Sequence, residues 1–332
     1  MRKIRVGILG TAQIADRYAV GAFRTLENAE LITVASRTEE KARAFAAKHG
    51  LEIDTYESLI SRDDIDVIYS PLPTGLQEEW MIKAMKSGKH CIVEKSITSS
   101  LSSAKRMLRA SEKYKVALYE NFVPEFHPQH ARIISLLKEG AIGEPLVWQG
   151  AYGFPPFPKE DIRYRADLAG GALNDCGCYT LFMARKIFDE EPIAVTCALS
   201  NDGHDVDIHG SALLEFAGGK TAFIAFGFDN HYQNTYSLWG SKGIVRTNRA
   251  YAVPPSLVPL VELVQNDGVK DMIRTIDVPA VNQFALSFDY FCNVVAQMDS
   301  AEMESMRTKI LQQARVMEAM RKSARTGKRI TV

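Results

Sequence analysis

Hydrophobic and polar positions follow two alternating periods in the first third of the chain. Short runs rich in β-branched residues lie at Ile4–Leu9, Leu31–Ala35, Asp66–Ser70, His90–Val93 and Val116–Tyr119. Between them, apolar residues recur with helical spacing at about 13–26, 38–49, 74–87 and 99–114. Apolar strands separated by helices are typical of a parallel sheet with helices on both faces. Residues 1–122 are therefore predicted to form a doubly wound α/β domain.

The spacing changes after residue 122, and the rest of the chain shows mainly longer alternating strands. They are predicted at Leu146–Phe154, Ile193–Ser200, Val206–Ala217, Lys220–Asp229 and Tyr232–Gly240. Gly218-Gly219 predicts a two-residue hairpin turn between two of these strands. Helices are expected at about 126–138, 171–189 and 282–326, and a loop at Ala252–Pro259. Residues 123–332 are therefore predicted to be an α+β domain with a mostly antiparallel sheet.

Length and charge fit a globular protein of two domains. A chain of 332 residues is too long for one ordinary hydrophobic core. Lysine and arginine together number 40, as do aspartate and glutamate, so the formal net charge is zero. This balance gives no reason to expect a nucleic-acid or anionic-membrane partner. A small molecule is the expected partner.

The cysteines and the amino-terminal segment predict a cytoplasmic location. The five cysteines are odd in number and scattered, and polar residues interrupt the short apolar start of the chain, so reduced thiols are expected. Cys176-Gly177-Cys178 lacks zinc-site spacing, and no nearby carboxylate completes a site with His127 and His130. No metal site is expected. No apolar run approaches the roughly 20 residues of a membrane-spanning helix.

A cofactor-binding turn is predicted where the first strand ends. The segment Gly10–Ala15, with the sequence GTAQIA, is a degenerate dinucleotide fingerprint in which alanine replaces the second and third glycines. Gly10 permits the tight turn, Ala12 lets the backbone approach a pyrophosphate, and Ala15 allows close contact between helix and sheet. The amide groups at the helix start would then face phosphate oxygens. The alternative is an ordinary turn between a strand and a helix.

The residues after the second strand distinguish between two nicotinamide cofactors. An acidic residue there would bind the ribose hydroxyl of NAD, but this chain has Ser36-Arg37-Thr38. A hydroxyl and a guanidinium suit the additional phosphate of NADP. NADP(H) is therefore the predicted cofactor, with NAD(H) as the second choice. The alternative is that Arg37 is an exposed arginine of a strand–helix turn.

Three residues that are distant in sequence are candidates for catalysis. Lys95 follows a buried strand at the edge where open α/β sheets bind ligands. Asp175 and Tyr179 are four residues apart and share one face if their segment is helical. A carboxylate, a phenol and a lysine that converge on one carbon would form a hydride-transfer site, in which the ammonium makes proton exchange by the phenol feasible. Alternatively, Asp175 caps the helix and Tyr179 packs beneath it.

Taken together, these motifs resemble one known family. Segments Gly10–Ala15, Pro71–Thr74, Gly88–His90, Glu94-Lys95 and Gly170–Tyr179 occur in the order and at the spacing of the glucose–fructose oxidoreductase / inositol dehydrogenase (Gfo/Idh/MocA) family. The resemblance covers essentially the whole chain. It implies a Rossmann domain that binds a nicotinamide cofactor and a second domain whose open-faced sheet helps to bind substrate. It also implies homodimers or homotetramers packed through that sheet.

The resemblance assigns roles to individual residues. Lys95 matches the active-site lysine, Asp175 the aspartate that contacts substrate, and Tyr179 the acid–base position, where many members have histidine. The residues expected at the cofactor are Gly10, Thr11, Ala12, Gln13, Ile14, Ser36, Arg37, Pro71, Leu72, Thr74, Glu94, Lys95 and Asn121. The residues expected at the substrate are Phe154, Arg163, Tyr164, Asn174, Asp175 and Tyr179.

Two departures from the family pattern lie on the cofactor side. Ser96 replaces the usual proline after Glu-Lys, so a different setting of Lys95 is expected. Gln77 stands where the family commonly has histidine, which leaves the polar partners at this point open.

The tyrosine at position 179 resembles one branch of the family, which includes glucose–fructose oxidoreductase, dihydrodiol and xylose dehydrogenases, and nucleotide-sugar 3-ketoreductases. The stretches Gly153–Pro158, 161–165, Glu120–Phe122 and His127–His130 favour the ketoreductases. The first hypothesis is NADPH-dependent reduction of a keto group on a sugar or nucleotide-sugar. The second is oxidation of a free sugar (xylose or glucose) or a trans-dihydrodiol, and the third is a regulatory NADP-binding protein without turnover. For Arg163, a salt bridge that holds its loop is the alternative to substrate binding.

Overall fold

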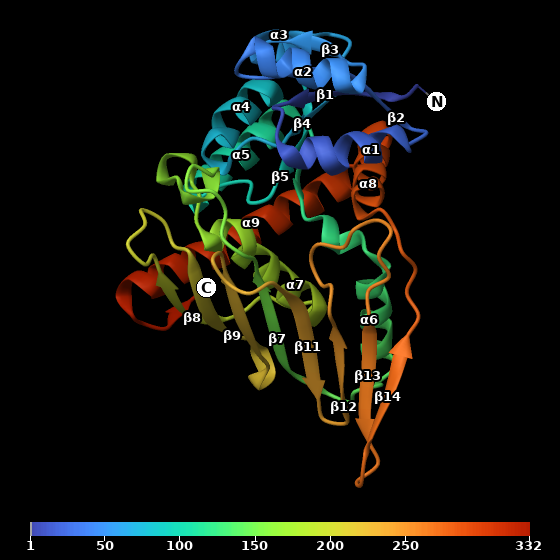
Figure 1. Cartoon of the computed structure of the whole chain (residues 1–332), viewed down its shortest axis with the longest axis vertical. Coiled ribbons are helices and arrows are strands. Elements are labelled where there is room, and N and C mark those ends of the chain that lie inside the picture. The colour runs from blue at the N-terminus through green and yellow to red at the C-terminus, as the bar shows by residue number, and fades with distance from the viewer. Residues whose placement is uncertain (1) are drawn as a thin grey trace. The chain divides into compact units, whose positions relative to one another are not determined.

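The computed structural model describes residues 2–332, which divide into two compact units. The first unit runs up to Phe122 and also includes Phe284–Ala314. The second comprises Val123–Gln283 and Arg315–Val332. The sequence predicts a division after residue 122, with the C-terminal helix packed back on the first domain. The structure groups Phe284–Ala314 of the C-terminal helical segment with the first unit. Figure 1 shows the labelled elements of both units.

The first unit contains a six-stranded parallel sheet. Its strands are β1 (Ile4–Leu9), β2 (Ala29–Ala35), β3 (Glu52–Asp54), β4 (Val67–Ser70), β5 (His90–Glu94) and β6 (Leu118–Asn121). The spatial order is β3-β2-β1-β4-β5-β6, which is the Rossmann order with its switch point between β1 and β4. The prediction of a doubly wound parallel sheet is confirmed. The sequence pattern missed β3, because only three residues pair there and two of them are exposed.

Helices connect these strands. They are η1 (Ala15–Ala19), α1 (Val20–Arg24), α2 (Glu39–His49), α3 (Tyr56–Ser61), α4 (Thr74–Lys86) and α5 (Leu101–Tyr114). Two further helices come from the C-terminal part of the chain: α8 (Gln283–Gln297) and α9 (Ser300–Thr326). The segment at about 282–326 is helical as predicted, and the structure divides it into two helices. Met298 has a positive φ of 49°, and Asp299 accepts hydrogen bonds from the amides of Ala301 and Glu302, so a new helix begins there.

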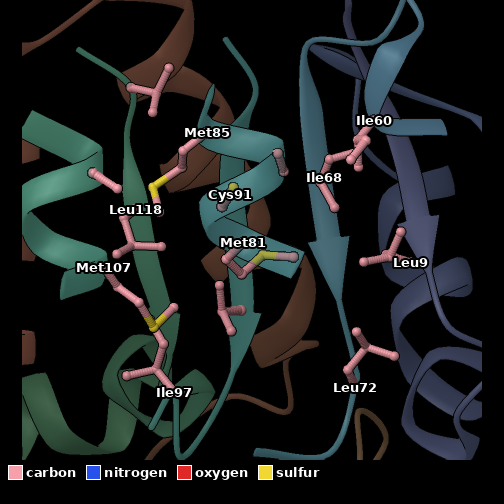
Figure 2. Packing of buried hydrophobic residues seen from close by; sticks show 14 of the residues in the cluster. Leu9, Ile60, Ile68, Leu72, Met81, Met85, Cys91, Ile97, Met107 and Leu118 are labelled. Carbon is pink, nitrogen blue, oxygen red and sulfur yellow. The ribbon is translucent and has the colours of Figure 1, made fainter. Parts of the chain in front are cut away.

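The core of the first unit lies between its sheet and helices α4 and α5. Met81, Met85, Cys91, Met107 and Leu118 are fully buried and point toward one another (Figure 2). Both faces of this parallel sheet are buried, so successive side chains along each strand are apolar, which explains the continuous apolar sequences of the strands. Truncation of one such side chain to alanine costs about 2–5 kcal/mol of folding free energy. This packing fixes the carboxyl ends of β1, β4, β5 and β6, where the candidate cofactor residues lie.

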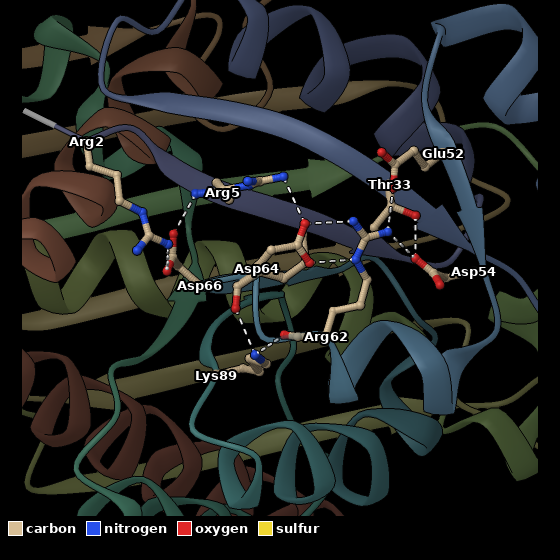
Figure 3. Close-up of polar contacts among 10 residues, drawn as sticks. Arg2, Arg5, Thr33, Glu52, Asp54, Arg62, Asp64, Asp66 and Lys89 are labelled. Atoms are coloured by element: carbon tan, nitrogen blue, oxygen red, sulfur yellow. Dashed lines mark hydrogen bonds and ion pairs between the residues drawn. The ribbon is translucent and has the colours of Figure 1, made fainter.

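Charged residues gather where several strands of this sheet begin. Arg62 binds Asp64 through two hydrogen bonds of 2.8 Å, and it also reaches Glu52 at 2.6 Å and Asp54 at 3.0 Å (Figure 3). Arg5 adds a third contact to Asp64 at 2.8 Å. The Arg62 guanidinium lowers the pKa of Asp64 to about 2. The charged side chains at this edge therefore pair with one another. Ligands of open α/β sheets bind at the opposite edge, where the strands end.

The second unit is built on a nine-stranded sheet. Its strands are β7 (Pro145–Gly153), β8 (Ala194–Ser200), β9 (His209–Glu215), β10 (Thr221–Gly227), β11 (Gln233–Gly240), β12 (Gly243–Thr247), β13 (Val261–Asn266), β14 (Asp271–Ile276) and β15 (Ile330–Thr331). Their order is β14-β13-β12-β11-β7-β10-β9-β8-β15. Only the β7–β10 pair is parallel among the pairs of this sheet in residues 2–332, so the prediction of a mostly antiparallel sheet is confirmed.

One face of this sheet is buried and the other is open. Trp148, Ile224 and Leu238 point into the unit, whereas Phe223 and Trp239 are 49% and 56% exposed. The buried face is covered by α7 (Cys178–Phe188), which packs against β7 and β10 (Figure 1). Near its N-terminal end, this unit also contains helix α6 (Pro128–Lys138). Short helical turns lie at Val123–Phe126, Ile162–Tyr164, Ala166–Leu168, Leu173–Gly177 and Ala217–Gly219.

The predicted two-residue turn at Gly218-Gly219 is wrong in its length. Strands β9 and β10 do form an antiparallel hairpin, but five residues separate Glu215 from Thr221. Phe216 donates its amide to the carbonyl of Lys220, and both glycines have positive φ angles, 69° and 81°. The two glycines serve the left-handed turn positions as expected, and the flanking residues add a helical turn that pattern alone does not reveal.

Candidate active site

The turn after β1 requires glycine at its first position. Gly10 has a φ of 122°, which side chains rarely permit, and an added Cβ would lie 3.0 Å from Cδ2 of Leu72. The amide of Gly10 donates to the carbonyl of Ala35 at 2.9 Å, which joins this turn to the end of β2. Leu72 itself belongs to the hydrophobic core. Glycine is therefore needed here both for its backbone conformation and for the close contact with Leu72.

A helix begins directly after this turn. The amides of Ala15 and Asp16 both donate to the carbonyl of Ala12, so the first backbone bonds of the helix start there. The amides of Gln13 and Ile14 precede these bonds, at the positive end of the helix dipole. Such amides bind phosphate groups. The segment Thr11–Ile14 thus has the arrangement that a dinucleotide pyrophosphate requires.

The end of β2 lies beside this turn. The hydroxyls of Thr11 and Ser36 are 3.2 Å apart, although 25 residues separate them in sequence. Arg37 is next in the chain and lies close to Tyr56: burial raises the pKa of Tyr56, while the backbone and the charge of Arg37 partly oppose this rise. The Tyr56 ring in turn packs edge-on against Trp80 at 4.8 Å. A hydroxyl, a guanidinium and two aromatic rings are therefore gathered near the fingerprint.

Glu94, at the end of β5, accepts hydrogen bonds from two neutral side chains and also interacts with the charge of Lys95. Its carboxylate is buried and accepts hydrogen bonds from the hydroxyl of Tyr69 at 2.9 Å and the amide of Asn121 at 2.8 Å. Asn121 accepts in turn from the hydroxyl of Ser287 at 2.7 Å. Burial raises the pKa of Glu94, although these hydrogen bonds lower it in part. The side chains of Glu94 and Asn121, both expected at the cofactor, thus bind one another.

Gln77 joins two turns of this sheet edge. It is fully buried, and its side-chain amide donates to the carbonyls of Leu72 and Glu94, each at 3.0 Å. The sequence left the partners at this position open. In the structure, Gln77 fixes the backbone that leads into Lys95 relative to the turn after β4. The sequence signal for this role was the position of Gln77 among the buried, core-facing positions of helix α4.

The turn that contains Lys95 has further polar supports. The hydroxyl of Thr74 donates to the carbonyl of Ser96 at 2.9 Å, and the amide of Ile97 donates to the carboxylate of Glu120 at 2.9 Å. The Lys95–Ser96 peptide bond is cis, although residue 96 is not proline. Pro71 is buried in the same unit. The backbone on both sides of Lys95 is therefore fixed by side chains from helix α4 and strand β6.

In the second unit, the glycine-rich motif starts a helix whose first turn is wide. Residues Leu173–Gly177 form a π-helix that continues directly into α7. A Cβ on Gly170 would lie 2.4 Å from the carbonyl oxygen of Arg163, and Gly171 has a φ of 104°. Both positions therefore need glycine because of close backbone approach and conformation. Short π-helical segments often mark functional sites.

Asp175 lies within this π-helix and is paired with an arginine. The Nε of Arg163 donates to Oδ2 of Asp175 at 2.7 Å. The Nη1 atom of Arg163 reaches Oδ1 of Asp161 at 3.1 Å, and its guanidinium stacks 4.2 Å above the ring of Phe157. Burial by itself would lower the pKa of Arg163, but Asp175 and Asp161 raise it above its ordinary value. Asp175 lies inside the helical segment and is not an N-cap residue, so the structure does not support the alternative that it caps the helix.

Tyr179 follows one helical turn after Asp175, and both side chains are half-buried. Its ring packs edge-on against Tyr152 at 5.3 Å and lies 6.3 Å from Tyr251. These aromatic neighbours fix the direction of the phenol without burying the whole residue. Asp175 and Tyr179 lie four residues apart on one continuous helical segment, and their sharing of one face stays a prediction.

The other residues expected at the substrate have partners of their own. The Asn174 side chain bonds to Arg321 of α9 and donates to the carbonyl of Ala169 at 2.9 Å. The Tyr164 hydroxyl donates to Asp229 at 2.8 Å. Phe154 stacks on Phe228, with ring centres 5.6 Å apart. Arg321 and Asp229 could not be found from the sequence, because nothing in their local spacing indicates this contact.

A buried carboxylate also holds the start of the motif helix. Asp207 accepts from the amide of Leu173 at 2.6 Å, and its backbone carbonyl accepts from the amide of Ala172 at 2.7 Å. Burial raises the pKa of Asp207. The position was missed because a lone aspartate before a strand carries no recognisable pattern.

The two histidines of α6 serve the interior of the second unit. His130 is fully buried, with its ring nitrogens 2.9 Å from the Tyr236 hydroxyl and 2.9 Å from the carbonyl of Ala250. Burial lowers the pKa of His130 to about 3 and that of His127 to about 4. Within residues 2–332, no group of three or more His, Cys, Asp or Glu residues is arranged to hold a metal ion.

The candidate residues thus form two sets. One set, which includes Lys95, lies at the carboxyl edge of the first unit's sheet, and the other, which includes Asp175 and Tyr179, lies on the motif helix of the second unit. Each set is assembled within its own unit. The convergence of Lys95 and Tyr179 on one substrate stays a prediction.

This combination of folds defines a class of two-domain oxidoreductases. Residues 4–122 match the model of an oxidoreductase family with an NAD-binding Rossmann fold, and residues 130–246 match the model of the GFO/IDH/MocA C-terminal domain. The chain belongs to the Gfo/Idh/MocA oxidoreductase family. In residues 2–332, no helix is long and apolar enough to cross a membrane.

The chain matches similar proteins over nearly its full length. It is 36% identical to a dTDP-3,4-didehydro-2,6-dideoxy-alpha-D-glucose 3-reductase of Saccharopolyspora spinosa, covering 98% of this chain and 99% of that protein. It is 30% identical to a D-xylose 1-dehydrogenase (NADP(+)) of Haloferax volcanii, covering 97% of each. A crystal structure of a 3-ketoreductase from Actinomadura kijaniata with NADP and TDP-benzene matches with a TM-score of 0.92 and 34% identity, covering 97% of this chain and 98% of that chain.

Proposed function

We propose that this protein reduces a keto group on a nucleotide-linked deoxysugar with NADPH. The observation that supports this most directly is the pair of Asp175 and Tyr179, one turn apart on the motif helix of a family whose similar full-length members include dTDP-sugar 3-reductases. Hydride transfer to a carbonyl needs a proton donor at oxygen and an acceptor that orients the sugar. A phenol and a carboxylate one turn apart on this helix supply both groups.

The first unit is proposed to hold NADP(H). Gly10 makes the tight turn after β1, and the amides of Gln13 and Ile14 at the start of the following helix would bind the pyrophosphate. Ser36 and Arg37 would bind the additional phosphate that distinguishes NADP from NAD. Other residues of the turns after β4, β5 and β6 are proposed to complete the site: Pro71, Leu72, Thr74, Glu94, Lys95 and Asn121. When bound, the nicotinamide supplies the hydride for the carbonyl carbon.

Proton transfer is assigned to residues of this chain. The Tyr179 hydroxyl donates its proton to the carbonyl oxygen as the alcohol forms. The Lys95 ammonium stabilises the negative charge that then develops on the phenol oxygen. The carboxylate of Asp175 accepts a hydrogen bond from a hydroxyl of the sugar and so fixes the reacting carbon. This mechanism requires Lys95 and Tyr179 to act on the same carbonyl group.

A substrate panel tests the proposal. The purified protein would be given NADPH with dTDP-3,4-didehydro-2,6-dideoxy-α-D-glucose, and NADP with D-xylose, D-glucose and a trans-dihydrodiol, while absorbance of the reduced nicotinamide is followed. Turnover of the dTDP-keto sugar at the highest kcat/KM supports the proposal. Preferential oxidation of D-xylose would support the second candidate, which the full-length match to a xylose dehydrogenase favours. Binding of NADPH without turnover of any of them would contradict both.

We also propose that the open face of the nine-stranded sheet joins copies of this chain into a homodimer or homotetramer. This face has a hollow of about 930 Å³ whose lining includes Phe223, Ala225 and Leu213. Exposed apolar area of this kind is typical of contact surfaces. Light scattering after gel filtration should give a multiple of the chain mass for the wild type, and F223D with W239D should give the monomer.

A cytoplasmic location is part of the proposal. All five cysteines are buried and unbridged. Burial raises the pKa of Cys91, Cys197 and Cys292 above the ordinary thiol value, which suits unreactive, reduced side chains. Thiol titration of denatured protein isolated under non-reducing conditions should count five free thiols, and fewer would contradict this assignment.

A further inference from the structure

Arg163 is enclosed by two carboxylates and an aromatic ring. Its Nε and Nη1 atoms are bound by Asp175 and Asp161, and its flat face lies on Phe157. The side chain is 31% exposed, and those of Asp175 and Asp161 are 19% and 23% exposed. Among these three residues, two carboxylates share one guanidinium. Carboxylate oxygens accept hydrogen bonds, so this arrangement suits a neutral hydroxyl that donates one.

The backbone of Arg163 is joined to the same helix that its side chain reaches. Gly171 donates its amide to the carbonyl of Arg163 at 2.9 Å, and a side chain at Gly170 would collide with that carbonyl. Asp161 accepts from the amide of Arg163 at 2.9 Å. The backbone from which the guanidinium extends is therefore held in place, and its nitrogen atoms bind Asp175 and Asp161. This geometry defines the position of one carboxylate oxygen of Asp175.

We propose that Arg163 is a positioning residue that acts through Asp175: it keeps this carboxylate charged and aimed, so that Asp175 accepts a hydrogen bond from an uncharged hydroxyl of the substrate's sugar. This inference rests on the proposed function for the role of Asp175. It differs from the sequence hypothesis, in which Arg163 contacts the substrate, and from the alternative of a salt bridge that only holds the loop.

Two substitutions next to Asp175 have opposite electrostatic effects. Arg163→Gln removes the cation, so the Asp175 carboxylate becomes easier to protonate. Asp161→Asn keeps an oxygen that can accept from the Arg163 amide but removes the competing negative charge, so Asp175 becomes harder to protonate. A loop that is merely loosened would not give shifts of opposite sign. Arg165→Gln is the matched control, because it breaks an exposed pair with Asp167 in the same loop.

The first measurement does not depend on turnover. Protein labelled with ¹³C at the aspartate carboxyl carbons would be titrated by NMR, with Asp175 identified by the signal that Asp175→Asn removes. The titration midpoint of Asp175 should move upward by about one pH unit or more in Arg163→Gln, because a neighbouring arginine lowers the pKa of a carboxyl group by at least about that amount. It should move downward in Asp161→Asn and stay in place in Arg165→Gln. An unchanged midpoint in Arg163→Gln would overturn the inference.

The second measurement is kinetic and uses the dTDP-keto sugar with NADPH. Arg163→Gln should lower kcat/KM roughly 10- to 100-fold and move its acidic limb to higher pH, while Arg163→Lys restores part of the rate. An equal loss at every pH, with the NMR midpoint unmoved, would show a structural role only and refute the inference. Absence of turnover in the wild type would refute the proposed function, whereas the NMR shifts would still establish that Arg163 controls Asp175.

Discussion

Two carboxylates flank the candidate catalytic residues, and they are held by opposite means. Glu94, which precedes Lys95, is buried and accepts hydrogen bonds from the neutral groups of Tyr69 and Asn121. Burial raises its pKa, and these hydrogen bonds and the charge of Lys95 oppose that rise in part. Asp175, one turn before Tyr179, is partly exposed and paired with Arg163. Neutral donors hold the buried carboxylate as a hydrogen-bond acceptor inside the protein. An arginine beside the partly exposed carboxylate helps it to retain its charge.

This difference assigns separate tasks to the two units. In the first unit, Glu94, Gln77, Thr74 and Glu120 hold the backbone around Lys95 in place. In the second unit, the groups proposed to meet the substrate lie one turn apart on the motif helix. The comparison therefore predicts that substitutions near Tyr179 affect chemistry directly, and that substitutions near Glu94 act through position and stability.

The largest effect is expected at the proton donor. Tyr179→Phe removes the hydroxyl but keeps the ring that packs against Tyr152. We expect kcat to fall by roughly 100-fold or more, because general acid catalysis contributes about that much. NADPH binding, followed by fluorescence, should stay within about twofold, since the residue lies in the second unit. Tyr114→Phe, on a helix of the first unit, is the matched control. Full turnover by the Tyr179 variant would exclude it as the acid.

The next effect contrasts the two carboxylates directly. Asp175→Asn should lower kcat/KM by about 10- to 100-fold, because an amide loses the charge that orders the sugar hydroxyl and also disrupts the pair with Arg163. Glu94→Gln keeps an oxygen that can accept from Tyr69 and Asn121, so its loss should be at least tenfold smaller. Steady-state kinetics with the dTDP-keto sugar measures both. Equal losses in the two variants would remove the distinction between the two sites.

A smaller effect concerns cofactor choice in the first unit. Arg37→Gln should weaken NADPH binding about tenfold or more, because a hydrogen bond to a charged group contributes roughly 1.5–3 kcal/mol. NADH binding should change little. Arg43→Gln, which breaks the exposed pair with Glu39 on α2, serves as the control. If NADH binds the wild type more tightly than NADPH, the NADP assignment is wrong.

The smallest effect is on stability and follows from the raised pKa of Glu94. The folded state favours protonated Glu94, so its contribution to stability is present below the unfolded pKa, about 4.5, and is lost as pH rises through the higher folded value. Glu94→Gln cannot ionise and lacks this loss. The difference in Tm between the variant and the wild type should therefore be more positive at pH 8 than at pH 5. A constant difference would show that Glu94 has no raised pKa.

Much of the first unit could be predicted because its strands are buried on both faces. Continuous apolar runs identified β1, β2, β4, β5 and β6 within a few residues. The fingerprint at Gly10 could be found because a positive φ and close approach leave glycine as the suitable residue. By contrast, β3 and α3 are short and partly exposed, so their pattern of apolar and polar residues is too weak to predict them. Strands β12, β13 and β14 were not predicted from the sequence either.

The amino-acid pattern by itself determined the fold class and the order of the elements, because periodicity is a local property. Lys95, Asp175 and Tyr179 became candidates because their segments resemble the motifs of a known family. Only the tertiary structure decided the partners: Gln77 with the carbonyl of Glu94, Ser287 with Asn121, and Arg163 with Asp175. Two of these pairs are separated by 17 and 166 residues in the chain. Hydrogen bonds and ion pairs of this kind depend on which surfaces meet after folding, and a one-dimensional pattern does not record that.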